Sequence, residues 1–227
     1  MHRSYGKRGP LVQRIATAIA GVSAAIVLAV GALVAAERPV KIVALGDSLM
    51  AGYQLPESAA FPAQLERALK ARGVAAEVVN AGVSGDTSSG GLARLDWSVP
   101  QGTDAVILEL GANDMLRGLD PKVTRAALDE IIGKLKARGI AVLLCGMRAP
   151  PNLGPDYARA FDAIYPELAA QHGVLFYPFF LEGVAAELGL NQRDGMHPTA
   201  DGIAAIVTRI GPNVEELIRR VRSGNHS

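Results

Sequence analysis

The segment VKIVALGDSLMAGY, residues 40–53, joins an apolar run to a stretch rich in turn-forming residues. The run VKIVAL has strand length and is almost continuously apolar, which is typical of a parallel strand covered on both faces. Gly46, Asp47 and Ser48 then supply the flexible backbone and short polar side chains that a tight turn needs. The segment therefore predicts a buried strand that ends in a turn carrying a serine.

Four more apolar runs of strand length follow, and helix-compatible stretches separate them. The runs are AEVVN (76–80), AVILEL (105–110), IAVLLCG (140–146) and VLFYPF (174–179). The helix-compatible stretches cover residues 61–73, 89–97, 124–139 and 157–173. This alternation predicts an α/β fold of three layers (α/β/α), a flavodoxin-like doubly wound sheet of five parallel strands with helices on both faces. In the third helix one face is expected to contain Val123, Ala126, Ala127, Ile131 and Leu135, with Gly139 as the stop.

Polar segments follow the predicted strands at the edge where open parallel sheets bind ligands. GDSLMAG follows the first strand, AGVSGDTSSGG the second and GANDMLRG the third. MRAPPN follows the fourth strand, and the fifth leads on to RDGMHP. If all five strands are parallel, these segments gather at one edge and their polar residues face a common crevice.

Ser48 becomes an effective nucleophile only if an imidazole removes its proton and a carboxylate orients that imidazole. His197 suits this role, because the segment DGMHP places Asp194 three residues before it in a glycine-containing loop. The entrance to a helix explains the same segment structurally, and both interpretations can hold together. His172 lies where a helix gives way to a strand, which favours a structural role. Ser48, Asp194 and His197 are the predicted triad.

Acyl transfer also needs N–H donors for the negative oxygen of the tetrahedral intermediate. Gly85 can bring its backbone N–H close to a substrate, and Asn113 can offer its side-chain amide. The backbone N–H of Ser48 would be the third donor. Taken alone, Gly85 is equally well explained as a turn glycine and Asn113 as a helix cap. Their positions after the second and third strands favour the oxyanion role.

Other classes of protein fit poorly. The chain lacks the G-x-S-x-G elbow of α/β-hydrolases, a nucleotide-phosphate loop and any zinc-ligand spacing, so neither a metal nor a cofactor is expected. Without residues 1–36, 19 basic and 22 acidic residues remain, a formal net charge of −3. This balance lacks the basic excess of a nucleic-acid-binding protein. Cys145, the only cysteine, lies in an apolar run and is expected to be a buried core thiol.

Residues 1–36 are expected to be an export signal. Four basic residues lie among the first 14, and residues 15–36 carry no charge and end in small residues before Glu37. A cleaved signal peptide is favoured, which would leave residues 37–227 as a single exported domain, periplasmic or secreted. The uncharged run of 22 residues is also long enough to span a bilayer, so an uncleaved inner-membrane anchor is the alternative. Membrane contact is expected only through that segment.

Four segments together resemble the sequence blocks of the SGNH, or GDSL, hydrolases. They are GDSLMAGY, NAGVSGDTSSGGLARL, ELGANDMLRG and DGMHP, and the similarity spans nearly all of residues 40–215. Within the family, the chain looks most like the exported bacterial thioesterase, lysophospholipase and arylesterase group. The resemblance implies Ser48 as nucleophile, His197 as base, Asp194 as its orienting acid, Gly85 and Asn113 as oxyanion donors, and a structural role for Asp47.

The resemblance also implies a substrate-binding loop. MRAPPNLGPDY, residues 147–157, matches the loop that borders the acyl pocket in this group, with Met147, Arg148, Pro150 and Tyr157 as its candidate contacts.

The expected function is that of a serine hydrolase of small carboxylic esters or thioesters, with lysophospholipids among the candidate substrates. One alternative is an O-acetylesterase of carbohydrates or cell-wall esters on the same fold. A non-catalytic binding protein is the other, but such a protein should lack at least one catalytic group, and all five are present.

Overall fold

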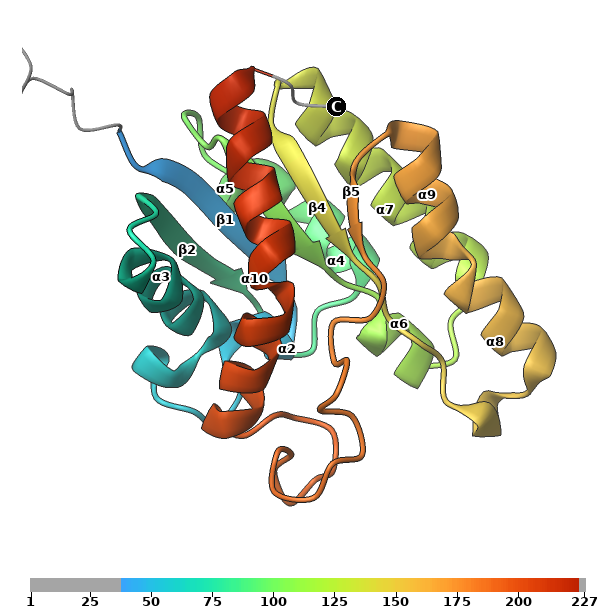
Figure 1. Cartoon of the computed structure of the whole chain (residues 1–227). Coiled ribbons are helices and arrows are strands. Elements are labelled where there is room, and N and C mark those ends of the chain that lie inside the picture. Colours follow the sequence, from blue (N-terminus) through green and yellow to red (C-terminus); the bar gives the residue numbers. More distant parts are fainter. Residues whose placement is uncertain (1–37, 225–227) are drawn as a thin grey trace, which may run out of the picture. The chain divides into compact units, whose positions relative to one another are not determined.

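Five parallel strands form one sheet in the order β2-β1-β3-β4-β5 (Figure 1). The computed structural model describes residues 38–224. From β1 the chain moves outward to β2, then returns across β1 and continues to β3, β4 and β5, which is the flavodoxin-like doubly wound order. The predicted fold class is therefore confirmed. The strands are β1 (Val40–Gly46), β2 (Ala76–Gly82), β3 (Ala105–Glu109), β4 (Ala141–Cys145) and β5 (Leu175–Tyr177).

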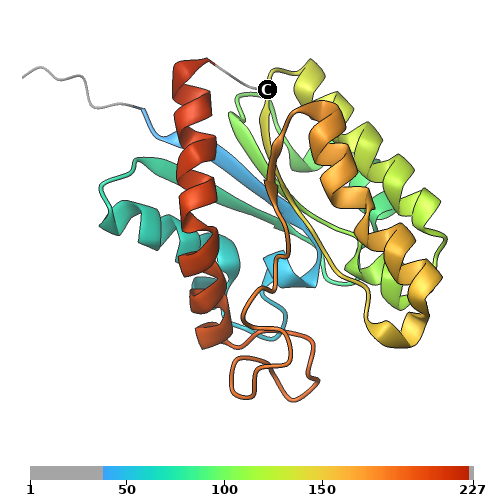
Figure 2. The same cartoon turned by 45° about the vertical axis from the view of Figure 1, so that its right-hand side comes forward.

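Helices cover both faces of this sheet. The helices α3 and α10 lie on one face, and α7 and α9 lie on the other, as Figures 1 and 2 show from two directions. The short helices α2 and α6 lie at the lower edge in Figure 1, where β1 and β3 end. The helices are α2 (Ser48–Ala51), α3 (Phe61–Ala71), α4 (Ser88–Ala93), α5 (Leu95–Ser98), α6 (Ala112–Leu116), α7 (Pro121–Ala137), α8 (Pro155–Asp162), α9 (Ile164–His172) and α10 (Ala200–Ser223), with 3-10 turns η1 (Glu57–Ala59) and η2 (Pro151–Leu153).

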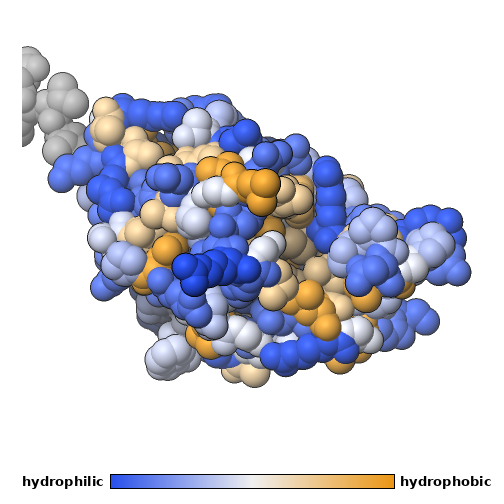
Figure 3. Space-filling view, turned by 90° about the horizontal axis from the view of Figure 1, so that it is seen from below, coloured by the Kyte–Doolittle hydropathy of each residue, from blue (hydrophilic) through white to orange (hydrophobic). Residues whose placement is uncertain are grey.

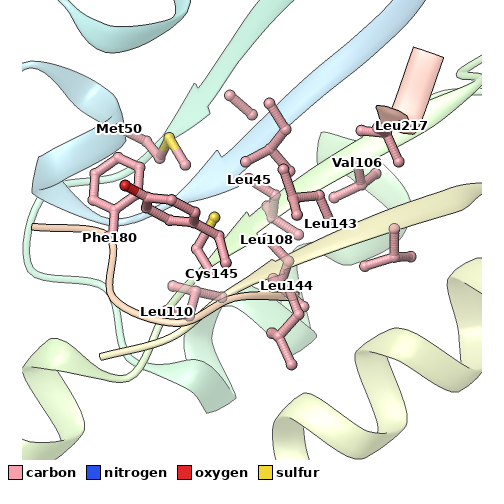
Figure 4. Close-up of a cluster of buried hydrophobic side chains, with 14 of the residues drawn as sticks. Leu45, Met50, Val106, Leu108, Leu110, Leu143, Leu144, Cys145, Phe180 and Leu217 are labelled. Atoms are coloured by element: carbon pink, nitrogen blue, oxygen red, sulfur yellow. The ribbon is translucent and has the colours of Figure 1, made fainter. Parts of the chain in front are cut away.

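The hydrophobic core lies on both sides of the central strands. Every residue of β3 and β4 is buried, and so is every residue of β1 except Lys41. Figure 4 shows Leu45, Leu108 and Leu143 of neighbouring strands packed together, with side chains from outside the sheet beside them. Burial on both faces explains why these strands appear in the sequence as nearly unbroken apolar runs. Cys145 belongs to this core and is free, as predicted.

Two of the predicted helices are each split in two. The stretch 89–97 divides at Arg94 into α4 and α5, and the stretch 157–173 divides at Ala163 into α8 and α9. Pro166 explains the second break, because a proline has no N–H for the carbonyl of Asp162, four residues earlier, and its ring crowds that carbonyl. Both stretches are helical, as the sequence indicated, and each contains two helices rather than one.

The long helix α7 confirms its predicted stop but corrects part of its predicted face. Asp120 caps its start by accepting the N–H of Lys122 at 2.9 Å, and Gly139, with a φ of 69°, follows its end. Val123 and Ala126 are exposed, contrary to the prediction. The face that packs on the sheet begins one residue later and consists of Thr124, Ala127, Leu128, Ile131, Ile132 and Leu135.

The expected signal peptide or anchor, residues 1–36, lies outside the described residues. Residues 39–224 form one compact unit. Within residues 38–224, no helix combines the length and the apolar character that crossing a membrane would require.

Candidate active site

Ser48 is the first residue of α2 and follows directly after β1. Asp47 caps this one-turn helix, since its Oδ1 accepts the N–H of Leu49 at 3.0 Å. Leu49 and Met50 are buried beneath the helix, whereas Ser48 stays partly exposed. Gly52 ends the helix in the left-handed conformation with a φ of 77°, which favours glycine. The turn thus holds Ser48 at the carboxyl edge of the sheet.

His197 links Ser48 to Asp194 through both of its ring nitrogens. Its Nε2 lies 2.8 Å from Ser48 Oγ, and its Nδ1 lies 2.7 Å from Asp194 Oδ2. With Asp194 ionised, Nδ1 carries the proton and donates it, which leaves Nε2 free to accept the proton of Ser48. The structure therefore brings the three predicted triad residues together, in the geometry of a nucleophile, a general base and an orienting carboxylate.

Asp194 is stabilised as a carboxylate by its own loop. Its Oδ1 accepts the backbone N–H of His197 at 3.0 Å and that of Met196 at 2.9 Å. These two bonds, with the bond to the His197 ring, lower the pKa of Asp194 to about 2. A fixed negative charge beside Nδ1 favours the imidazolium that forms when His197 takes a proton.

Two residues that the sequence analysis did not select hold His197 in place. The Tyr53 ring lies against the imidazole, with the ring centroids 4.3 Å apart. Gln192 donates from Nε2 to the carbonyls of Tyr53 at 2.8 Å and Pro198 at 3.0 Å, and its backbone N–H donates to the His197 carbonyl. Tyr53 stands within the quoted GDSLMAGY segment, but nothing in the sequence indicates that it meets a histidine 144 positions later.

Asn113 lies on α6 and faces the same pocket as Ser48 and His197. Its Nδ2 donates to Asp47 Oδ2 at 3.0 Å and to the Asp86 carbonyl at 2.9 Å. Both acceptors are oxygens, so they fix which end of the amide carries the N–H groups. A substrate oxyanion would share one of these two N–H groups.

Gly85 belongs to the loop that contacts the Asn113 amide, although it is not among the residues that line the pocket. Its φ of 82° lies in the left-handed region, so the turn itself requires glycine here. Arg117 Nη2 holds the Gly85 carbonyl at 2.7 Å. The structure thus supports the backbone explanation for Gly85 and leaves its oxyanion role as a proposal.

Arg94, which the sequence analysis did not select, links the ends of β1 and β2 to the loop that contains Asp86. Its guanidinium donates to the carbonyls of Gly46 at 2.9 Å and Ala81 at 2.8 Å, at the ends of β1 and β2. It also pairs with Asp86 Oδ2 at 2.7 Å, with both side chains largely buried. One largely buried cation therefore anchors the ends of β1 and β2, just before Ser48.

An apolar pocket of about 380 Å³ opens beside Ser48 and His197. Figure 3 views this edge of the molecule from below, where apolar residues gather between hydrophilic ones. Met147, Arg148 and Pro150 line the pocket, as the resemblance implied. The segment after β5 supplies lining residues that the sequence analysis missed, because nothing in their spacing marks them: Phe179, Leu181, Ala185, Ala186 and Met196.

Tyr157 and His172 lie apart from this pocket. Tyr157 is the one candidate of the substrate-binding loop that does not line it, because its hydroxyl donates to the Leu119 carbonyl at 2.9 Å and its ring stacks on Phe161. His172 is the last residue of α9, and its Nε2 lies 2.6 Å from Asp129 Oδ1. Across residues 38–224, no three His, Cys, Asp or Glu side chains cluster as a metal site would require.

Comparison with known proteins places this geometry in a family. The sequence profile of the GDSL-like Lipase/Acylhydrolase family matches residues 44–205. A Vibrio mimicus protein named Arylesterase is 44% identical over 165 residues, which are 72% of this chain and 82% of that protein. The Escherichia coli K12 protein named Thioesterase 1/protease 1/lysophospholipase L1 is 42% identical over 175 residues, 77% of this chain and 83% of that protein.

A solved structure agrees with these sequence matches. The crystal structure of AlinE4, described as an SGNH-hydrolase family esterase, is 46% identical and superimposes with a TM-score of 0.67. The match covers 79% of this chain and 96% of that chain. Sequence profile, relatives and strand order all confirm the resemblance carried by the four blocks: the chain belongs to the GDSL-like lipase/acylhydrolase family and is an ester-bond hydrolase with the SGNH fold.

Proposed function

We propose that the protein hydrolyses carboxylic esters and thioesters through an acyl-enzyme formed on Ser48. The observation that carries this proposal is the continuous line of hydrogen bonds from Ser48 Oγ through His197 to Asp194, beside an apolar pocket. A lone serine hydroxyl is a weak nucleophile, and this arrangement supplies both the base and the charge that orients it.

In the acylation half, Ser48 Oγ attacks the carbonyl carbon while His197 Nε2 takes the hydroxyl proton. The carbonyl oxygen becomes negative and is stabilised by the Ser48 and Gly85 backbone N–H groups and the Asn113 amide. The bond from carbon to the leaving oxygen or sulfur then breaks, and His197 passes its proton to the leaving group. The products of this half are an alcohol or thiol and an ester on Ser48.

In the deacylation half, water takes the place of the leaving group. His197 removes a proton from the water as it attacks the Ser48 ester, and the same N–H donors stabilise the second tetrahedral intermediate. The bond between the acyl carbon and Ser48 Oγ breaks, and Oγ recovers its proton from His197. The acid leaves and the enzyme returns to its starting state.

The pocket lining supports an apolar acyl group. Hydrocarbon and thioether surface lies next to Ser48, from Leu49, Met115, Met147 and Phe179. Binding an alkyl chain there is favourable because it removes the chain from water. Lysophospholipids and acyl thioesters carry such chains, and the Escherichia coli relative is named for both activities. We rank O-acetyl sugars below these substrates, because an acetyl group would leave most of the pocket unfilled.

The test is a turnover panel with Ser48→Ala as control. We expect wild-type turnover of p-nitrophenyl esters to rise from acetyl to longer acyl chains, with hydrolysis of acyl thioesters and lysophospholipid as well, and none from Ser48→Ala. A fluorophosphonate probe should label the wild type on Ser48 alone. Normal activity of Ser48→Ala would overturn the catalytic assignment, and a preference for acetylated sugars would replace the acyl-chain proposal by the O-acetylesterase.

We also propose that the protein is exported, with residues 1–36 as its signal. The support is the basic head and the uncharged run of 22 residues that follows it. The intact mass of the exported protein tests this: a chain beginning near Glu37 indicates cleavage, and a full-length chain in the membrane fraction indicates an anchor. A full-length chain in the cytoplasm would contradict export.

A further inference from the structure

Two carboxyl groups lie together beneath the nucleophile, and the mechanism above uses neither. Asp47 follows β1 and Glu109 ends β3, and their strands are neighbours, with Gly46 opposite Glu109. Both residues have an exposed fraction of 0%. Glu109 Oε2 accepts the Asp47 backbone N–H at 3.4 Å, and the two carboxyl groups lie close enough to form a hydrogen bond with each other. A hydrogen bond between two carboxyl groups requires that one of them carries a proton.

The hydrogen-bond partners decide which group keeps the charge. Asp47 Oδ1 accepts the N–H of Leu49 at 3.0 Å, and Oδ2 accepts the Asn113 amide at 3.0 Å. Glu109 Oε1, in contrast, has no hydrogen-bond partner among the described residues and is fully buried. An ionised Glu109 would leave a buried charge poorly compensated, whereas a neutral carboxyl leaves only one unpaired carbonyl oxygen. The proton therefore belongs to Glu109.

The surroundings agree with that assignment. Burial, followed by the charge of Asp47, raises the pKa of Glu109 well above its usual range, and burial raises that of Asp47 to about 6. His197 faces Asp47 and favours its ionised form. Arg94 binds the Gly46 carbonyl beside the pair. Two more titratable groups, Cys145 and Tyr165, interact electrostatically with Glu109. Burial raises the pKa of both, so both are neutral.

The pair connects directly to the proposed oxyanion hole. Glu109 contacts Asp47, and Asp47 Oδ2 holds the Asn113 amide, so three groups form one chain of hydrogen bonds. Gly46 lets the carboxyl approach the backbone, since a Cβ there would lie 2.7 Å from Glu109 Oε2. A hydrogen-bond donor that is out of place stabilises a transition state much less. A shift of Asp47 would move the Asn113 amide and so lower the rate of catalysis.

We propose that Glu109 is a positioning residue of the oxyanion hole: in its protonated form it donates a hydrogen bond to Asp47 and so fixes the carboxylate that orients Asn113. The Leu49 N–H and the Asn113 amide each bind one oxygen of Asp47, and the bond from Glu109 adds a third contact that fixes the orientation of the carboxylate. The inference rests on the proposed function, because Asn113 must act on the oxyanion for the position of its amide to affect turnover.

The test compares Glu109→Gln, which keeps an N–H donor of the same shape, with Glu109→Leu, which removes it. Turnover is measured per active serine, counted by fluorophosphonate labelling, so that misfolded enzyme does not enter kcat. We expect Glu109→Gln to keep kcat within about threefold and Glu109→Leu to lose about 10- to 100-fold, with KM changed far less. Asn113→Ala sets the scale, with an expected loss of about 10²–10³-fold.

The matched control is Leu128→Ala, which weakens the core beside α7 without touching Asp47, Glu109 or Asn113. Its kcat per labelled serine should equal that of the wild type. If Glu109→Leu behaves like this control, or if Glu109→Gln loses as much as Glu109→Leu, the proposal is overturned. Failure of the proposed function is a separate outcome, because the wild type itself would then show no turnover dependent on Ser48.

A second measurement does not depend on activity. At pH 7 the infrared spectrum of the wild type should contain the carbonyl stretch of a protonated carboxyl group, which Glu109→Gln should lack. The wild type without this band, or Glu109→Gln that keeps it, would show that Glu109 does not carry the proton.

Discussion

Two aspartates flank the reacting residues Ser48 and His197, and the protein holds them in opposite ways. Asp47 is fully buried beneath the nucleophile, and burial raises its pKa to about 6. The Asp194 side chain is 33% exposed, and its own loop's N–H groups lower its pKa to about 2. Both are ionised at pH 7, Asp47 despite its burial and Asp194 with the support of its loop.

This difference follows from where each half of the site is built. Ser48 and Asp47 belong to a turn between a buried strand and a one-turn helix, so the core determines their positions. His197 and Asp194 belong to an irregular, mostly exposed segment before α10, which local contacts hold in place. An isolated bridge joins Asn191 to Pro198 in that segment. The nucleophile is therefore positioned by the fold, and the base by a few hydrogen bonds.

The largest effect on turnover should come from removing the charge of Asp194, in the exposed half of the active site. Asp194→Asn keeps the size of the side chain but removes its charge, and an amide that donates toward Nδ1 favours the wrong tautomer of His197. By analogy with other triads, kcat should fall about 10⁴-fold. Stopped-flow or steady-state hydrolysis of a p-nitrophenyl ester measures this loss. Near-wild-type kcat would show that Asp194 does not orient the base.

The same division explains what the sequence could predict. Apolar runs indicated all five strands, although only β1, β3 and β4 are buried on both faces, and short segments after the strands contain the candidates Ser48, Asn113 and His197. Pro166 is a local signal for the break between α8 and α9, within a stretch whose other residues are compatible with a helix. Each of these features can be recognised from residues that are neighbours in the sequence.

Residues whose role depends on distant contacts could not be found in that way. In the sequence, Arg94 is one basic residue in a helix-compatible stretch, and nothing there indicates that it binds the ends of β1 and β2. Gln192 and Tyr53 meet across 139 positions of sequence. Glu109 left one usable signal, because it is the single charged residue in the apolar run AVILEL, where each neighbour is buried. A lone carboxyl in such a run predicts a buried polar contact without naming its partner.

The pH dependence of stability gives a smaller effect, whose sign distinguishes the two aspartates. Asp47 has a folded pKa above its usual value of 3.8, so its favourable contribution is complete below about pH 4 and is lost as the pH rises through 6. Asp194 has a folded pKa below 3.8, so its contribution is present above about pH 4 and is lost as the pH falls toward 2.

Urea unfolding of the wild type, Asp47→Asn and Asp194→Asn across this range measures both contributions. Relative to the wild type, Asp47→Asn should become more stable as the pH rises from 4 to 6, because the wild type alone must bury a new charge. Relative to the wild type, Asp194→Asn should be less stable by a constant amount above pH 4, and that deficit should shrink below it. Curves that stay parallel for both variants would show that neither carboxyl titrates differently in the folded protein. A pH-dependent difference in stability for Asp47→Asn but not for Asp194→Asn would show that folding shifts the pKa of Asp47 alone.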